Sequence, residues 1–267
     1  MSRIEEARKS YPINKPLLGI EGFCHVMAKI FCKENIDGVQ NLEKIRELSN
    51  SGHPIIMVGN HRSNADAAAL YAGLVKAGFE DLAKKIKYIL GQRLKFDWKT
   101  RYLTRGYSHI DVFPPTVSTD EREMRRMKAE MNSAAMKNAK DVLSNNGILG
   151  LFPEGGRTKD GVMHDFLPET MAFALLCEDT YIAPFSLVGT DNVWPVGSSV
   201  WHRKDVGLNF AAPFSVDEVV VGAGSGSEKR LLLARRAQIE VVKLSPVEYI
   251  PKEMEMRMGQ EYAIVRK

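Results

Sequence analysis

The 267-residue chain has the composition of a folded, water-soluble protein: 44% of its residues are hydrophobic and 26% are charged, which excludes disordered and fibrous classes. The 37 Lys and Arg against 33 Asp and Glu leave a net charge of +4, too small to indicate a nucleic-acid-binding protein. No stretch approaches the ~20 apolar residues of a membrane-spanning helix. Because the first residues are charged and no apolar core follows them, they do not resemble a secretory signal. We therefore expect an intracellular, cytoplasmic protein that is soluble or touches a membrane only peripherally.

The first 50 residues form a segment of their own in the sequence. Residues 1–16 are polar and predict a loose arm, and the apolar spacing over 17–31 predicts a helix that docks on the core. A second short helix is expected at 42–48. We assign 1–50 to an N-terminal helical arm that packs on the core and 51–267 to the main domain.

The main domain alternates between strand and helix patterns. Short apolar runs predict strands at 55–58, 87–90, 109–113, 147–152, 181–188 and 207–210. Helices are expected at 64–76, 120–144, 167–178 and 228–244, the last capped by Ser227. This alternation predicts an α/β fold with a mixed, largely parallel central sheet flanked by helices. The three cysteines show neither a C-x-x-C pair nor zinc-ligand spacing, so no metal site is predicted.

The segment Asn60-His61-Arg62-Ser63-Asn64-Ala65-Asp66 follows an apolar strand and precedes an alanine-rich helix. His61 and Asp66 can meet only if the histidine lies in the turn and the aspartate in the first helical turn, with Ser63 or Asn64 as N-cap. A carboxylate on Nδ1 would leave Nε2 of the imidazole to accept a proton. The sequence thus predicts a His–Asp general base. The alternative is a purely structural capping role for Asp66.

A second segment, Leu151-Phe152-Pro153-Glu154-Gly155-Gly156-Arg157-Thr158-Lys159, also follows an apolar strand. In a parallel sheet the carboxyl ends of both strands can open on the same edge. The two glycines allow backbone amides to approach an anion, while Arg157 and Lys159 supply a bidentate fork and a point charge. This combination predicts a site for a phosphate monoester. The alternative is an ordinary Gly-Gly turn with solvated charges.

Together the two segments resemble the glycerolipid acyltransferase superfamily. Its first motif, N-H-x4-D, is matched by Asn60, His61 and Asp66, and its P-E-G-x-R motif by 153–157. A later motif, a proline following a strand after the next helix, is matched by Ile182-Ala183-Pro184-Phe185. The resemblance covers about residues 50–195 and is strongest to the soluble plastid and chlamydial glycerol-3-phosphate acyltransferases. Those enzymes have G-G-R-x-R, from which Lys159 departs while keeping the charge.

The family's remaining motif places a basic residue shortly after a glycine-led strand. Here the stretch 106–114 offers His109 within the strand and Arg105 before it, but no Arg or Lys after it. Both are candidate substrate-binding residues on this resemblance. The alternative for His109 is a hydrogen-bonded residue inside a strand.

The resemblance implies transfer of a fatty acyl group from an acyl thioester to the hydroxyl of glycerol 3-phosphate, in phospholipid biosynthesis. His61 would be the base, Asp66 would hold it, and Asn60, Glu154 and the amides of Gly155 and Gly156 would shape the acceptor pocket. The implied partners are acyl carrier protein or coenzyme A as thioester co-substrate, with no other cofactor, and a plant-type enzyme would work in the plastid stroma. The rivals are a lysophospholipid acceptor such as lysophosphatidate, a hydrolase, and a non-catalytic protein that binds anionic lipid.

Overall fold

A computed structural model describes residues 13–15, 26, 32–91, 105–113, 122–158, 160–198 and 200–257. The strands of its single sheet are β1 (Cys32–Asp37), β2 (Ile55–Gly59), β3 (Ile86–Gly91), β4 (His109–Val112), β5 (Ile148–Leu151), β6 (Tyr181–Val188), β7 (Lys204–Phe210) and β8 (Phe214–Ser215). The helices are α3 (Val39–Asn50), α4 (Asp66–Lys76), α5 (Glu80–Lys85), α7 (Arg122–Ser144), α8 (Thr190–Val193), α9 (Val216–Val220) and α10 (Gly226–Lys243), with 3-10 turns η2 (Pro168–Leu175) and η3 (Val247–Tyr249).

The sheet has the order β1-β7-β6-β2-β5-β3-β4, and β8 pairs with β6. Strand β2 lies at its centre and runs parallel to both of its neighbours, β5 and β6. Strands β3 and β4 continue in parallel, whereas β7 is antiparallel to β6. The predicted α/β fold with a mixed, largely parallel sheet is therefore confirmed.

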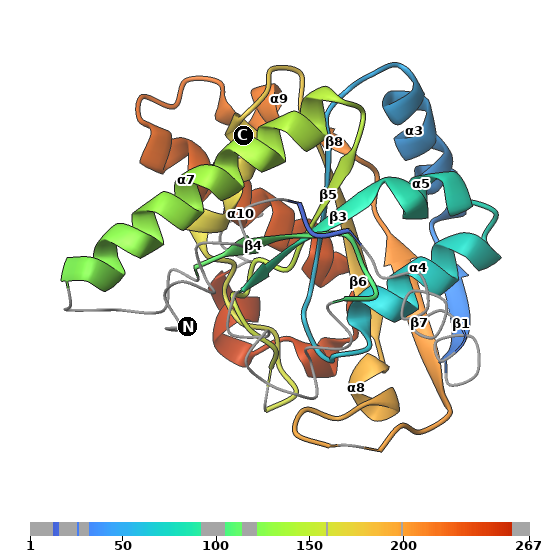
Figure 1. The fold of residues 1–267 in the computed structure, drawn as a ribbon. Helices are drawn as coiled ribbons and strands as arrows, with labels where there is room; N and C mark the ends of the chain where they lie inside the picture. The colour runs from blue at the N-terminus through green and yellow to red at the C-terminus, as the bar shows by residue number, and fades with distance from the viewer. Residues whose placement is uncertain are drawn as a thin grey trace.

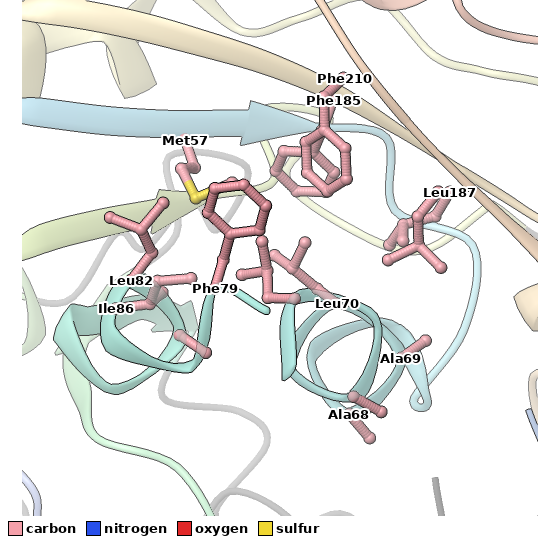
Figure 2. Packing of buried hydrophobic residues seen from close by; sticks show 14 of the residues in the cluster. Met57, Ala68, Ala69, Leu70, Phe79, Leu82, Ile86, Phe185, Leu187 and Phe210 are labelled. Atoms are coloured by element: carbon pink, nitrogen blue, oxygen red, sulfur yellow. The ribbon is translucent and has the colours of Figure 1, made fainter. Parts of the chain in front are cut away.

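The side chains of β2 divide between two hydrophobic cores, one on each face of the sheet, because successive residues of a strand point to opposite faces. Ile55 and Met57 join the core beneath α3, α4 and α5, and Ile56 and Val58 join the core beneath α7 and α10. Figure 1 shows these two helical layers around the central strands. Figure 2 shows the first core, where Phe79 packs beside Met57 and Leu70.

Strand β1 was not predicted from the sequence. Its six residues, CKENID, are mostly polar, and the strand pairs in parallel with β7 at the edge of the sheet. Cys32 is nevertheless buried and belongs to the same core as the α3 residues Leu42 and Ile45. Residues 32–50 thus contribute a strand and a helix to the main sheet and its core. The helix expected at 17–31 lies outside the described residues except for Val26, which is exposed.

Two predicted helices differ from those observed. The helix expected over 167–178 is the shorter 3-10 turn η2. The last helix begins two residues early, because Ser225 and not Ser227 is its N-cap, accepting a hydrogen bond from the Glu228 N–H at 3.1 Å. Ser225 has the extended backbone conformation of an N-cap residue, with φ −122° and ψ 154°.

We expect that replacing Phe79 by alanine destabilises the protein by about 3–5 kcal/mol, the usual loss for a buried phenylalanine. The Phe79 side chain is 1% exposed, and the Arg46 guanidinium lies 4.0 Å from its ring centroid. Denaturant unfolding monitored by circular dichroism measures the change. The exposed Val221→Ala serves as control and should remain within about 0.5 kcal/mol of the parent. A loss below about 1 kcal/mol for Phe79→Ala would show that this core tolerates the cavity.

Candidate active site

The two motif segments leave the sheet at the same edge. Strands β2 and β5 are parallel neighbours in which Val58 pairs with Leu151, so the loops that follow them start side by side. The Thr158 N–H donates a hydrogen bond to the His61 carbonyl at 3.0 Å, which joins the loops beyond the strands. The expectation that both segments open on one edge is confirmed.

His61 and Asp66 meet as the spacing predicted. His61 Nδ1 lies 2.7 Å from Asp66 Oδ2. Because an ionised carboxylate only accepts hydrogen bonds, Nδ1 carries the hydrogen and Nε2 is left as the acceptor. The His61 side chain is 20% exposed, whereas Asp66 is completely buried. The pair therefore has the geometry of a general base that is open to substrate on one side.

The turn between the two residues is organised by the same carboxylate. Asp66 Oδ2 also accepts hydrogen bonds from the backbone N–H of Arg62 at 2.7 Å and of Ser63 at 2.9 Å. The prediction that Ser63 or Asn64 caps α4 is wrong, because Ala65 is the N-cap residue and has no side-chain cap bond. The Ser63 hydroxyl instead donates to the Trp194 carbonyl at 2.7 Å, which attaches the turn to the segment after β6.

Asn60 is buried and turned toward strand β6. Its Nδ2 donates to the Leu187 carbonyl at 2.9 Å, and its Oδ1 accepts from the Leu187 N–H at 2.7 Å. These two bonds continue the β2–β6 pairing by means of a side chain. Asn60 thereby fixes where the turn that carries His61 begins, while the substrate contact expected for it stays a prediction.

Glu154 connects the second motif to the backbone of the first. Its Oε1 accepts from the His61 N–H at 2.6 Å, and its Oε2 accepts from the His164 N–H at 2.8 Å. Burial raises the pKa of this carboxyl to about 7, against the lowering effect of the two backbone hydrogen bonds. Glu154 therefore holds the residue that carries the imidazole, and its place in an acceptor pocket stays a prediction.

The two segments 60–66 and 151–158 meet in a junction, and Gly155, Gly156 and Arg157 lie on its exposed side. Gly155 has φ of 72°, a left-handed conformation that favours glycine, and both glycines are exposed. Arg157 Nη1 donates to Asn64 Oδ1, so its half-buried guanidinium lies against the turn that carries His61. Lys159 lies outside the described residues.

The structure does not bring His109 and Arg105 to this junction. Strand β4 is three strand positions from β2, about 14 Å at the usual spacing. His109 begins β4 and is buried there, with Nδ1 2.9 Å from the Tyr107 carbonyl oxygen and Nε2 3.7 Å from Asp111 Oδ1. Arg105 precedes the amino end of that strand, whereas His61 follows the carboxyl end of β2. His109 thus matches the alternative interpretation, a hydrogen-bonded residue inside a strand.

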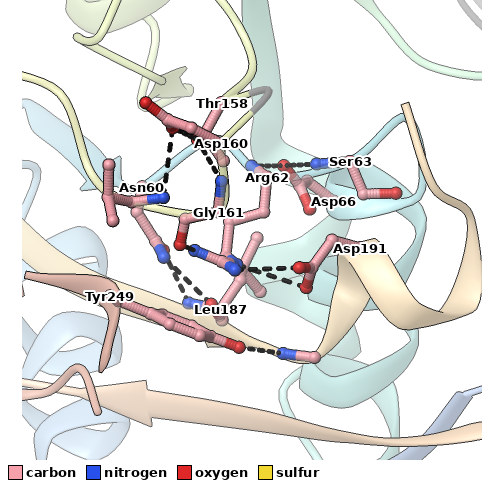
Figure 3. A network of polar contacts seen from close by, with 12 residues as sticks. Asn60, Arg62, Ser63, Asp66, Thr158, Asp160, Gly161, Leu187, Asp191 and Tyr249 are labelled. Atoms are coloured by element: carbon pink, nitrogen blue, oxygen red, sulfur yellow. Dashed lines mark hydrogen bonds and ion pairs between the residues drawn. The ribbon is translucent and has the colours of Figure 1, made fainter. Parts of the chain in front are cut away.

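The sequence analysis missed a polar network around Arg62 (Figure 3). The Arg62 side chain is 3% exposed and binds Asp191 through Nε and Nη2 at 3.2 and 2.8 Å. Its Nη1 donates to the Gly161 carbonyl at 3.0 Å, and its Cζ lies 3.3 Å from the ring centroid of Tyr249. The Tyr249 hydroxyl accepts from the Gly189 N–H at 2.9 Å. The one sequence signal was the position of Arg62 next to His61; nothing in the sequence pairs it with residues 129 and 187 positions away.

None of the helices formed by the described residues combines the length and apolarity that crossing a lipid bilayer requires.

A His–Asp pair follows the carboxyl end of the central strand of a mixed α/β sheet. The family model for acyltransferases matches residues 37–188. The match spans more than half of the chain, which therefore belongs to the acyltransferase family, within the glycerolipid superfamily.

Relatives of two kinds are similar to this chain. The chloroplastic glycerol-3-phosphate acyltransferase of Arabidopsis thaliana is 27% identical over 57% of this chain and 29% of its own length. The chloroplastic 1-acyl-sn-glycerol-3-phosphate acyltransferase of the same plant is 26% identical over 66% of this chain and 44% of its own length. The crystal structure of the 1-acyl-sn-glycerophosphate acyltransferase from Thermotoga maritima shares the fold, with a TM-score of 0.54 and 21% identity over 85% of this chain and 78% of that one. The matches thus span less than half the length of these two plant relatives.

We expect the free energy of unfolding to vary with pH because the Glu154 carboxyl has a different pKa in the folded and unfolded forms. Because the folded-state pKa is about 7, above the value of 4.5 for an unperturbed carboxyl, the folded form holds its proton more tightly than the unfolded form. The protonated Glu154 carboxyl therefore stabilises the folded form by up to about 3 kcal/mol. This stabilisation is fully present below about pH 4.5 and is lost as pH rises to 7.

The measurement is the free energy of unfolding of the wild type and of Glu154→Gln at pH 5 and pH 8. The variant is expected to be less stable at both values, since its amide nitrogen cannot accept from a backbone N–H. The stability gap should be larger at pH 5. A gap that is equal at both pH values, or larger at pH 8, would contradict the raised pKa.

Proposed function

We propose that the protein transfers a fatty acyl group from an acyl thioester to the hydroxyl of glycerol 3-phosphate. The observation that carries this proposal is the contact of Arg157 with Asn64, three residues after His61. It places a guanidinium, the side chain best suited to bind a phosphate, beside the turn that carries the base. An acceptor held by its phosphate at Arg157 would present its hydroxyl toward His61.

The reaction then needs no covalent acyl-enzyme. His61 Nε2 removes the hydroxyl proton while the acceptor oxygen attacks the thioester carbonyl carbon. The tetrahedral intermediate collapses, the carbon–sulfur bond breaks, and the imidazolium returns the proton to the departing thiolate. The buried Asp66 carboxylate, 2.7 Å from Nδ1, stabilises the imidazolium between these two steps.

The donor in this proposal is the thioester of acyl carrier protein or of coenzyme A, and no further cofactor takes part. Lysophosphatidate is a second candidate acceptor, favoured by the similarity to the 1-acyl-sn-glycerol-3-phosphate acyltransferases. It carries the same phosphate monoester, so Arg157 would bind either acceptor. A peripheral membrane contact would accompany a lipid acceptor. A non-catalytic lipid-binding protein is disfavoured, because binding alone gives no use to a histidine held by a buried carboxylate.

The experiment that tests the proposal offers purified protein a labelled acyl thioester with glycerol 3-phosphate, with lysophosphatidate or with neither. Acylation of glycerol 3-phosphate at the higher kcat/KM supports the proposal. Preference for lysophosphatidate would establish the second candidate. Release of free fatty acid at the same rate without acceptor would identify a hydrolase, and no consumption of thioester with either donor would contradict acyl transfer.

We expect His61→Ala to lower kcat by about 10²–10⁴-fold, the usual contribution of a general base. The acceptor KM should change little, because the imidazole does not hold the phosphate. Steady-state kinetics with both substrates varied measures the effect, and an unchanged circular dichroism spectrum checks the fold. Turnover within tenfold of the wild type would contradict the mechanism.

Arg157→Ala is expected to raise the KM for glycerol 3-phosphate by about 10- to 150-fold, since charge-assisted hydrogen bonds contribute about 1.5–3 kcal/mol. The donor KM should remain almost unchanged. Glycerol without its phosphate is the control acceptor: it should be very poor for the wild type, and the variant should differ little from the wild type with it. Equal losses with glycerol and glycerol 3-phosphate would assign Arg157 a structural role.

A further inference from the structure

Phe152 provides a flat apolar surface against which the imidazole of His61 lies. The two ring centroids are 4.5 Å apart, and the ring planes are inclined by 20°. Phe152 is the first residue after β5, and β5 is the strand next to β2. The stack therefore joins the same two strand ends as the hydrogen bonds of Glu154 and Thr158.

The Phe152 ring is itself held by aromatic neighbours. Tyr88 of β3 lies 6.3 Å from it with planes inclined by 3°, and Phe185 of β6 meets it edge-on at 6.0 Å. Gly150, which pairs with Tyr88, leaves space for that ring, since a Cβ there would lie 2.8 Å from Tyr88 Cδ1. Residues of β3 and β6 thus hold the Phe152 ring, and Gly150 of β5 makes room for one of them.

Two constraints act together on the imidazole. The hydrogen bond to Asp66 fixes the position of Nδ1 but leaves the ring free to tilt about that contact. The stack on Phe152 fixes the plane of the ring and hence the direction of Nε2. In addition, an aromatic face attracts a cation, which is what the imidazole becomes when it takes the hydroxyl proton.

We propose that Phe152 is a positioning residue for the reaction: it sets the plane of the His61 imidazole so that Nε2 points at the acceptor hydroxyl, and it stabilises the imidazolium. This inference rests on the proposed role of His61 as general base. It predicts a defect in the chemical step and not in the binding of either substrate.

The test compares Phe152→Leu, which removes the aromatic face, with Phe152→Tyr, which keeps it. The matched control is Phe173→Leu, the same substitution at a buried phenylalanine of the core on the other face of the sheet. For Phe152→Leu we expect kcat to fall by about 3- to 30-fold, the range of cation–π contributions. Both KM values should stay within about twofold of the wild type. Phe152→Tyr should restore most of kcat, and Phe173→Leu should lower the melting temperature without this loss of kcat.

A second readout is independent of catalysis. In the free protein, ring current from Phe152 should shift the imidazole proton signals of His61 upfield, and these are assigned by their loss in His61→Ala. Phe152→Leu should move the signals downfield, while Phe152→Tyr and Phe173→Leu leave them in place. Unmoved signals in Phe152→Leu, or a kcat equal to that of Phe173→Leu, would overturn the inference. If the wild type transfers no acyl group, the proposed function fails and the proton signals alone decide whether Phe152 orients His61.

Discussion

The burial of the Asp66 carboxylate is the constraint on which the site depends. A fully buried charge is costly unless hydrogen bonds surround it. Asp66 Oδ2 takes its hydrogen bonds from His61 Nδ1 and from the backbone N–H of Arg62 and Ser63. The turn before α4 must therefore wrap around the carboxylate, and the imidazole is drawn to the same oxygen. One carboxylate oxygen thus shapes the backbone of the turn and holds Nδ1 of the imidazole.

Two other buried groups extend this arrangement to neighbouring segments. The Arg62 side chain extends from the turn and contacts Asp191 and Tyr249, both in the C-terminal part of the chain. Glu154 binds the His61 backbone from the opposite loop. Removing one partner of a buried polar pair leaves the other without a hydrogen bond. Each of these contacts therefore ties the turn 60–66 to a different segment of the chain. Asp191 and Tyr249 both lie beyond residues 37–188, where the family model matches, so segments outside that match hold Arg62 of the turn.

The separation between positioning and reacting groups bears on substrate choice. Asn60 and Glu154 direct their polar atoms at backbone groups of Leu187, His61 and His164. His61 and Arg157, by contrast, lie partly exposed at the same edge. Under the proposed roles, a histidine base and a nearby guanidinium would suit either acceptor, because glycerol 3-phosphate and its acylated form carry the same phosphate. The protein surface around the rest of the acceptor would then distinguish glycerol 3-phosphate from its acylated form.

The sequence by itself determined the α/β fold, a buried strand at 55–58 and the meeting of His61 with Asp66, because apolar periodicity and the geometry of one turn are local properties. It also predicted that 60–66 and 151–159 would share an edge, since the carboxyl ends of parallel strands do so. It did not reveal β1, whose polar residues form a strand only by pairing with β7. The partners of Arg62, Asn60 and Phe152 were likewise decided by the tertiary structure, because they come from strands and loops distant in sequence that only the order of strands in the sheet brings together.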